Sequence, residues 1–243
     1  MNRFYTEHDI SLSKVIHLTD KDEVHHIKNV LRLKPEQNIF LFNGQYIEAE
    51  AKILTISKSD IRLSIEKVWQ HDVQYPLITL VCAIPKKSKF ELIIEKATEA
   101  GAHDIIPVIT DHSDVKMKTL TAVKTKRYNM VALNAAKQSQ RYSIPEIHAV
   151  ASLKKVVESL HSTHALLVAG LNGERQTILT ALPQLTRAKK VAIFIGPEGD
   201  FSRDEYAFMR EKSAQVVSLG QNVLKVETAA ITAVAIVQAF FHP

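Results

Sequence analysis

The chain is poor in cysteine and glycine and has no apolar run long enough to cross a membrane. Cys82 is the only cysteine among 243 residues, so an internal disulfide framework is excluded. Its apolar neighbours Leu80 to Ala83 favour a buried structural thiol over a nucleophile. The longest apolar stretch, residues 228–241, predicts a buried helix. Because residues 1–10 carry no apolar signal segment, we expect a cytoplasmic protein with no membrane partner.

Positive charge is in modest excess, and the excess lies in the middle of the chain. The net charge is +5; residues 73–150 hold eleven Lys/Arg against seven Asp/Glu, whereas residues 1–72 hold ten against eleven. Such a distribution suits a phosphate backbone, although charge alone favours an ordinary solvated surface. The central cations are Lys86, Lys87, Lys89, Lys116, Lys118, Lys124, Lys126, Arg127, Lys137 and Arg141.

The first seventy residues have the periodicity of strands. Residues 47–53 and 61–66 alternate apolar with polar side chains, and the dipeptide Asn43-Gly44 is typical of a hairpin turn. One helix is expected near residues 20–31, with Val24, Ile27 and Leu31 on one face. These features predict a small β-barrel domain over residues 1–72, followed by a linker within residues 69–76.

Residues 73–243 alternate strands with helices instead. Apolar strands are predicted at 77–84, 105–109, 165–169, 191–195 and 216–219, and a helix at 88–100 with Gly101 as its C-cap. Strands that are apolar throughout indicate a mostly parallel sheet covered by helices on both faces, so the second domain is of the α/β class.

Two glycine-marked loops follow late strands of this sheet. One is Gly196 to Ser202 and the other Leu219 to Ala230; each lies where open α/β sheets bind ligands. A Rossmann domain places its glycine-rich turn after the first strand, but here that turn, Pro85 to Lys89, has no glycine. The ligand loops are therefore expected at the C-terminal end of the chain. Ser202 and Glu205 form a capping box and are expected to be structural.

The loops resemble the signature segments of the RsmE-type 16S ribosomal RNA uridine-N3 methyltransferases of the SPOUT superfamily. Residues 22–34, 96–101 and 135–145 also resemble segments of that family, so the similarity covers nearly the whole chain. Three residues depart from its pattern. Asp200, Lys225 and Ala100 stand where the family usually has glycine, arginine and leucine.

The resemblance implies a fold, a cofactor and partners. Residues 73–243 would form a SPOUT-type domain with a trefoil knot, residues 1–72 a PUA-like RNA-binding domain, and the chain a homodimer. The cofactor would be S-adenosylmethionine and the substrate a uridine N3 of 16S rRNA, free or in the small ribosomal subunit. Two alternatives stay open: ribose 2′-O-methylation by the same fold, and a non-catalytic RNA-binding assembly factor.

The matching positions give candidate site residues. Methylation at uridine N3 needs a cation to stabilise charge on the uracil ring and a group that accepts a proton. Lys225 and Glu227 are the expected pair, with Arg141 contacting phosphate or base; an ion pair or helix cap is the alternative for Glu227. The expected cofactor-binding residues are Ala169, Gly170, Gly196, Gly199, Leu219, Gly220, Val223 and Leu224.

The remaining candidates concern RNA and metal. No metal site is expected, because the pairs His25-His26 and His161/His164 lack further ligands at suitable spacing. Residues 111–114 have the composition of a triad but are expected to form a polar loop. The expected RNA contacts are Arg3, His25, Arg32, Lys86, Lys89 and Arg127.

Overall fold

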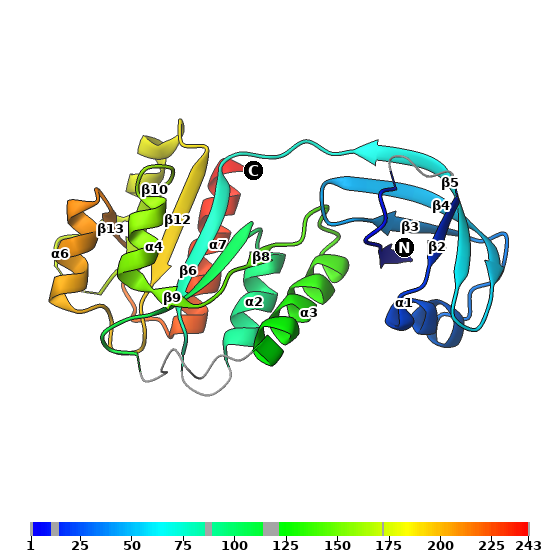
Figure 1. Ribbon diagram of the computed structural model, residues 1–243. Helices are drawn as coiled ribbons and strands as arrows, with labels where there is room; N and C mark the ends of the chain where they lie inside the picture. The colour runs from blue at the N-terminus through cyan, green and yellow to red at the C-terminus, as the bar shows by residue number, and fades with distance from the viewer. Residues whose placement is uncertain (1, 11–14, 86–88, 114–121, 172, 243) are drawn as a thin grey trace. The chain divides into compact units, whose positions relative to one another are not determined.

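The computed structural model describes residues 2–10, 15–85, 89–113, 122–171 and 173–242, which form two compact units (Figure 1). The first unit consists of Met1–Val73 together with Ala136–Ile144, and the second of Gln74–Ala135 with Pro145–Pro243. A segment remote in sequence thus completes the first unit.

The first unit is built on a five-stranded sheet in the order β1-β3-β4-β5-β2. Strand β1 is parallel to β3 and the other pairs are antiparallel. Register shifts in the β4/β5 ladder increase its twist and help the sheet curl around the core. The predicted small PUA-like domain is confirmed, but in the described residues its β-barrel is a curled sheet whose edge strands β1 and β2 do not pair. Strand β5 continues through Gln70, so placing the start of the linker at Trp69 was wrong. The strands are Arg3–Tyr5 (β1), Val15–Leu18 (β2), Asn38–Phe42 (β3), Ile47–Ile56 (β4) and Ile61–Gln70 (β5).

A short helix of this unit changes its winding midway. Helix α1, Lys21–His25, is capped by the Asp20 carboxylate and passes into a π-turn over His26–Val30. Val24 and Ile27 are buried as predicted, whereas Leu31 is exposed. The π-turn is the reason: its i to i+5 bonds, such as Leu31 N–H to the His26 carbonyl, rotate Leu31 off the buried face.

The second unit contains an eight-stranded sheet whose ladders are all parallel. Its order is β11-β13-β10-β12-β6-β7-β8, and β9 also pairs with β7. The predicted parallel sheet is confirmed, with the expected strands lying within one residue of those observed. The strands are Leu77–Ala83 (β6), Asp104–Ile109 (β7), Glu146–Ile147 (β8), Ala151–Ser152 (β9), Ala165–Ala169 (β10), Gln176–Thr177 (β11), Lys190–Ile195 (β12) and Gln215–Ser218 (β13).

Helices cover both faces of this sheet (Figure 1). Helices α2 (Phe90–Glu99) and α7 (Val226–Phe241) pack together, with α7 against β6 and β12. Helices α4 (Leu153–Leu160) and α6 (Arg203–Glu211) cover the other face and enclose a core that includes Phe194 and Met209. Apolar side chains on both faces of each strand explain the uninterrupted apolar runs. The other helices are α3 (Ala122–Gln138) and α5 (Ile178–Ala181), which runs into a 3-10 turn at Leu182–Leu185.

Several local predictions also hold. Gly101 follows α2 with φ +109°, a conformation suited to glycine at a helix end. Cys82 is fully buried, and burial raises the pKa of its thiol, so it is an inert structural residue. Among the described residues, no helix combines the length and apolar character needed to span a bilayer. The trefoil knot stays a prediction.

Candidate functional site

Three loops meet at the carboxyl edge of the eight-stranded sheet. They follow β10, β12 and β13, which are neighbours in parallel register, so their carboxyl ends lie side by side. The loops enclose a cavity of about 290 Å³, which we call the loop cavity. Its walls are mostly backbone and apolar side chains with a few polar groups, the usual character of a small-molecule site.

Most of the expected cofactor-binding residues line the loop cavity. Gly199 is the exception. The backbone turns between Pro197 and Asp200, and Gly199 lies beside His112, whose Nδ1 donates to the carbonyl oxygens of Gly199 and Asp200 at 3.1 and 2.9 Å. His112 belongs to the polar loop predicted at residues 111–114. This loop therefore supports the turn through the described residue His112. The expected residues in the cavity wall are Ala169, Gly170, Gly196, Leu219, Gly220, Val223 and Leu224.

Two glycines of the cavity wall are needed for different reasons. Gly220 has φ +147°, a conformation that side-chain-bearing residues rarely adopt, while the space around its missing Cβ is open. At Gly170, a Cβ would lie 2.4 Å from the Tyr206 hydroxyl. A larger residue at 170 would therefore force Tyr206 out of place.

Asp200 joins two of the loops beneath the cavity. Its φ of +60° is one that glycine favours and that Asp tolerates, so the backbone permits an aspartate at the position where the family resemblance predicts glycine. The buried carboxylate accepts hydrogen bonds from Leu171 N–H at 3.2 Å, Phe201 N–H at 2.9 Å and the Tyr206 hydroxyl at 2.8 Å. Burial, followed by the hydrogen bond to Asp200, raises the pKa of Tyr206, so this hydroxyl remains a donor.

The sequence did not indicate that Tyr206 and Arg175 support the loops of the cavity. Arg175 lies in the cavity wall and donates from Nη1 to the carbonyl oxygens of Gly170 and Leu171, both at 2.9 Å. Neither Arg175 nor Tyr206 belongs to a recognisable motif. The capping box, by contrast, was visible in the sequence, and both of its hydrogen bonds between Ser202 and Glu205 are present.

The predicted catalytic pair separates in the structure. Lys225 is exposed in the wall of the loop cavity, at the N-cap position of α7. Glu227 lies outside that wall, and its carboxylate accepts a hydrogen bond from Lys89 Nζ at 2.6 Å. This bond lowers the pKa of Glu227, which makes it a weaker proton acceptor. The geometry therefore favours the ion-pair alternative for Glu227, with the distant Lys89 as its partner, and the RNA contact of Lys89 stays a prediction.

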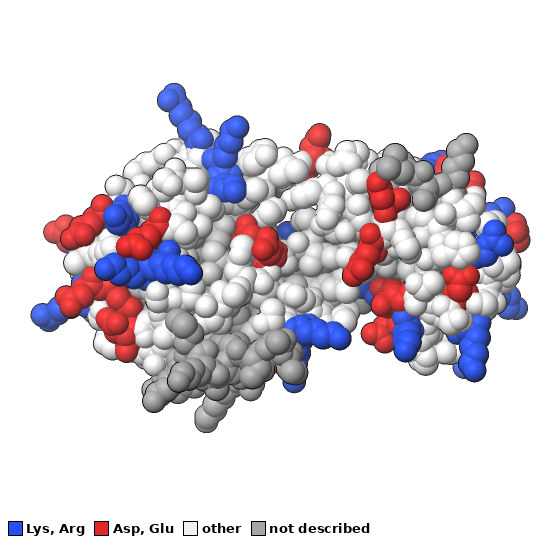
Figure 2. All heavy atoms as spheres, viewed as in Figure 1, with Lys and Arg blue, Asp and Glu red and all other residues white. Residues whose placement is uncertain are grey.

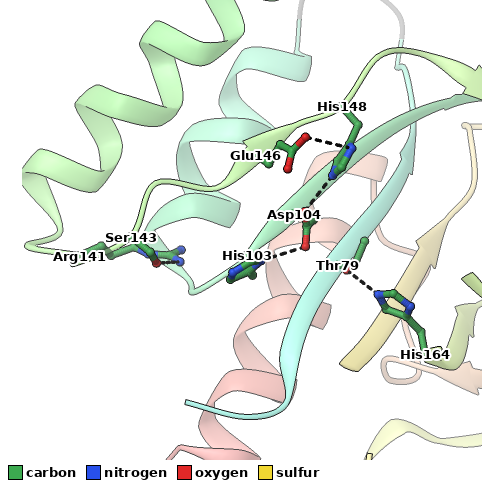
Figure 3. A network of polar contacts seen from close by, with 8 residues as sticks. All are labelled: Thr79, His103, Asp104, Arg141, Ser143, Glu146, His148 and His164. Carbon is green, nitrogen blue, oxygen red and sulfur yellow. Dashed lines mark hydrogen bonds and ion pairs between the residues drawn. The ribbon is translucent and has the colours of Figure 1, made fainter. Parts of the chain in front are cut away.

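Arg141 belongs to the first unit, whereas Lys225 and Glu227 belong to the second. Its guanidinium donates to Ser143 Oγ at 3.2 Å (Figure 3), and its carbonyl oxygen accepts from Arg3 Nη2 at 2.8 Å. Burial lowers the pKa of Arg141 to about 10, so the side chain stays positively charged at neutral pH.

A second cavity, of about 260 Å³, lies within the first unit. The second cavity is lined mainly by polar residues, among them residues from the segments around His26 and Gln138. These two segments, residues 22–34 and 135–145, are among those that resemble the family. In the wall of this cavity, the Arg3 guanidinium is buried over the Phe42 ring, 4.0 Å from the ring centroid, and pairs with Glu48 at 2.8 Å. The wall consists of Asn2, Arg3, Phe4, His26, Leu31, Lys137, Gln138 and Gln140.

The expected RNA contacts have different surroundings. His25 and Arg32 are exposed, whereas the Arg127 guanidinium pairs with Glu91 at 2.7 Å. Lys86 lies outside the described residues. On the face that Figure 2 shows, the visible Lys and Arg side chains are interspersed with Asp and Glu and form no broad basic patch.

Comparison with known proteins decides the family. An RNA methyltransferase domain model matches residues 73–238, and an RNA methyltransferase PUA domain model matches residues 18–66. The chain belongs to the ribosomal RNA small subunit methyltransferase E family. A member from Rickettsia conorii is 30% identical over 235 residues, which cover 96% of this chain and 93% of that protein.

Solved structures agree over nearly the full length. A ribosomal RNA small subunit methyltransferase E from Neisseria gonorrhoeae bound to S-adenosylmethionine superposes with a TM-score of 0.86, at 26% identity, over 99% of this chain and 98% of that one. A Legionella pneumophila protein in complex with the same cofactor gives 0.84 at 30% identity, over 98% and 97%. The predicted family and fold class are confirmed.

Proposed function

We propose that this chain transfers a methyl group from S-adenosylmethionine to N3 of a uridine in 16S ribosomal RNA. The observation that carries the proposal is the convergence of three loops on one cavity, with Lys225 in its wall. The relatives named ribosomal RNA small subunit methyltransferase E, and two structures with bound cofactor, support the substrate and the cofactor.

The loop cavity suits this cofactor chemically. Adenine can be held by backbone N–H and C=O groups, which the turns at Gly196 and Gly220 bring to the surface of the cavity. The cofactor also carries cationic groups, and the wall includes the carboxylates Glu198 and Asp200. When bound there, it supplies an electrophilic methyl group on a sulfonium.

The chain's own residues would stabilise charge rather than form covalent bonds. As N3 loses its proton, negative charge spreads over the uracil ring oxygens, and the Lys225 ammonium in the cavity wall can stabilise it. The N3 electron pair then forms the bond to the methyl carbon as the carbon–sulfur bond breaks. Because Lys89 holds Glu227, we assign Glu227 to positioning the start of α7 and assign the proton acceptor to solvent.

We propose that the first unit docks the RNA. Its polar cavity, close to the exposed His25 and Arg32, offers guanidinium, imidazole, ammonium and amide groups together. Arg3 would support this surface from inside, because its guanidinium is held by Glu48 and the Arg141 carbonyl. The expected boundary between residues 72 and 73 lies one residue from the observed end of the first segment at Val73, and a supporting role for Arg141 belongs to this proposal.

We further propose that the protein works in the cytoplasm as a homodimer of its second unit. Helix α7 buries one face on the sheet but leaves Ala235, Ala239 and Phe240 exposed. A second copy would cover these apolar groups. Light scattering at micromolar concentration should give the dimer mass, and an active monomer would contradict this part of the proposal.

Labelled methyl transfer tests the reaction. Small ribosomal subunits and naked 16S rRNA from a strain that lacks this gene are incubated with the protein and isotopically labelled S-adenosylmethionine, and the nucleosides are analysed by mass spectrometry. We expect label in N3-methyluridine. Label in a 2′-O-methylated nucleoside would indicate the ribose reaction, and RNA binding without transfer would indicate an assembly factor.

A further inference from the structure

Titratable side chains gather at the amino edge of the eight-stranded sheet, opposite the loop cavity. Asp104 begins β7, and Glu146 and His148 come from β8 and the residue just after it, about forty positions later in the chain. Figure 3 shows the three side chains directed toward one another, with His103 on the other side of Asp104. The methyltransferase chemistry proposed above does not use any of them.

The backbone holds these residues in place. Asp104 and Glu146 are register partners in the parallel ladder. The Glu146 N–H donates to the His103 carbonyl at 3.1 Å, and the His148 N–H donates to the Ile105 carbonyl at 3.0 Å. Because residues two apart along an extended segment share a face, Glu146 and His148 both lie on the side of Asp104.

The ligand atoms are close enough to share one ion. One ring nitrogen and one oxygen from each carboxylate all lie within 4.8 Å of one another, and His148 Nε2 is 2.8 Å from Asp104 Oδ1. Two ligand atoms of a tetrahedral ion with bonds of about 2.1 Å lie about 3.4 Å apart. Glu146 Oε1 lies 3.6 Å from the other ring nitrogen of His148, Nδ1, and because this side chain is 73% exposed it can rotate toward an ion shared with Asp104.

The donor set selects a class of metal. We propose that Asp104, Glu146 and His148 bind one divalent transition-metal ion, such as Zn²⁺. An imidazole with two carboxylates suits zinc and its neighbours, whereas Mg²⁺ and Ca²⁺ prefer oxygen ligands alone. His103 Nδ1 lies 2.9 Å from Asp104 Oδ2 and would orient that carboxylate as an outer partner of the ion.

A metal here would have a structural role. Strand β8 has only two residues, and it follows directly after residues 136–144, which belong to the first unit. An ion bound by residues of β7 and β8 would stabilise the pairing of these strands at the point where the chain returns to the second unit. The sequence did not indicate this site, because its ligands come from two separate segments and not from a histidine pair.

The test uses tag-free, full-length protein that has been treated with chelator and dialysed. Zinc binding is measured by calorimetry, and the visible absorption of added Co²⁺ reports whether the ion has protein ligands. We expect one saturable site per chain and a higher melting temperature with zinc. Glu146→Gln, His148→Gln and Asp104→Asn should each weaken zinc binding by about tenfold or more.

His161→Gln is the matched control, because it removes an exposed histidine that lies outside the cluster. It should bind zinc as the wild type does. Glu146→Gln keeps the test decisive even if the other variants fold poorly, since this side chain is largely exposed. The proposal is overturned if the wild type has no saturable zinc site, or if Glu146→Gln and His148→Gln bind zinc with unchanged affinity.

Discussion

The two edges of the eight-stranded sheet differ in the chemical groups that they present. At the carboxyl edge, glycine turns and backbone groups enclose the loop cavity, and its charged side chains lie among mostly apolar walls. At the amino edge, ligand atoms of Asp104, Glu146 and His148 lie within 4.8 Å of one another. In a parallel sheet, the loops that follow the strands lie at one edge and the loops that precede them lie at the other. A single sheet can therefore carry two sites of unrelated chemistry.

The largest effect is expected at the carboxyl edge from Gly220→Val. Valine at φ +147° is strained, and its side chain would enter the space that a ligand needs. We expect S-adenosylmethionine affinity to fall by about a hundredfold, measured by calorimetry. Gly173→Val is the control, because Gly173 also has a positive φ but lies outside the cavity wall. Equal losses in both variants would show that strain alone is responsible.

Lys225→Ala should affect chemistry without affecting cofactor binding. Loss of the ammonium removes a group that stabilises charge on the uracil ring, and we expect single-turnover methylation to slow by about tenfold to a hundredfold. The rate is measured at saturating RNA, alongside RNA affinity across a salt series. Lys155→Ala, an exposed cation on α4, serves as control. A wild-type rate for Lys225→Ala would transfer the role to the backbone of the same loop.

Asp200→Gly tests the link beneath the cavity. Glycine relieves the positive φ, but Leu171 N–H, Phe201 N–H and the Tyr206 hydroxyl lose their acceptor. We expect the free energy of unfolding, measured in urea, to fall by about 1–2 kcal/mol. Adding Tyr206→Phe to this variant should cost less than it does in the wild type, because the hydrogen bond is already lost. A variant as stable as the wild type would contradict this account.

Asp104→Asn should have the smallest effect on methylation. The residue lies at the opposite edge from the loop cavity, so we expect the methylation rate at saturating cofactor to change by less than about twofold. The same variant should lose zinc affinity, which separates the two edges in one protein. A large loss of methylation with normal folding would show that the edges are coupled.

Local periodicity predicted much of the fold. The strand at residues 165–169 and the helix ending at Phe241 were visible as long apolar runs, because most residues in both are buried or half-buried. The position of the ligand loops was also predictable, because the loops that follow the strands of a parallel sheet all lie at its carboxyl edge. Gly199 does not line the loop cavity, and the sequence does not show which way a residue faces in a tight turn.

Contacts between distant residues could not be predicted in this way. The Lys89–Glu227 ion pair joins residues 138 positions apart, so the sequence around either residue does not indicate it. Residues 136–144 complete the first unit although the segment begins inside α3, at a point where the composition of the helix does not change. The bond from Tyr206 to Asp200 depends on a backbone φ that the sequence does not specify. Each of these contacts can be identified only from the folded structure.

Hydrogen–deuterium exchange with and without S-adenosylmethionine tests the central claim most directly, because it reports on every loop in the unmodified protein. The account predicts slower exchange in residues 169–171, 195–200 and 217–226, with no change at residues 103–104 and 146–148. Protection at the amino edge, or unchanged exchange in all three carboxyl-edge loops under saturating cofactor, would contradict it.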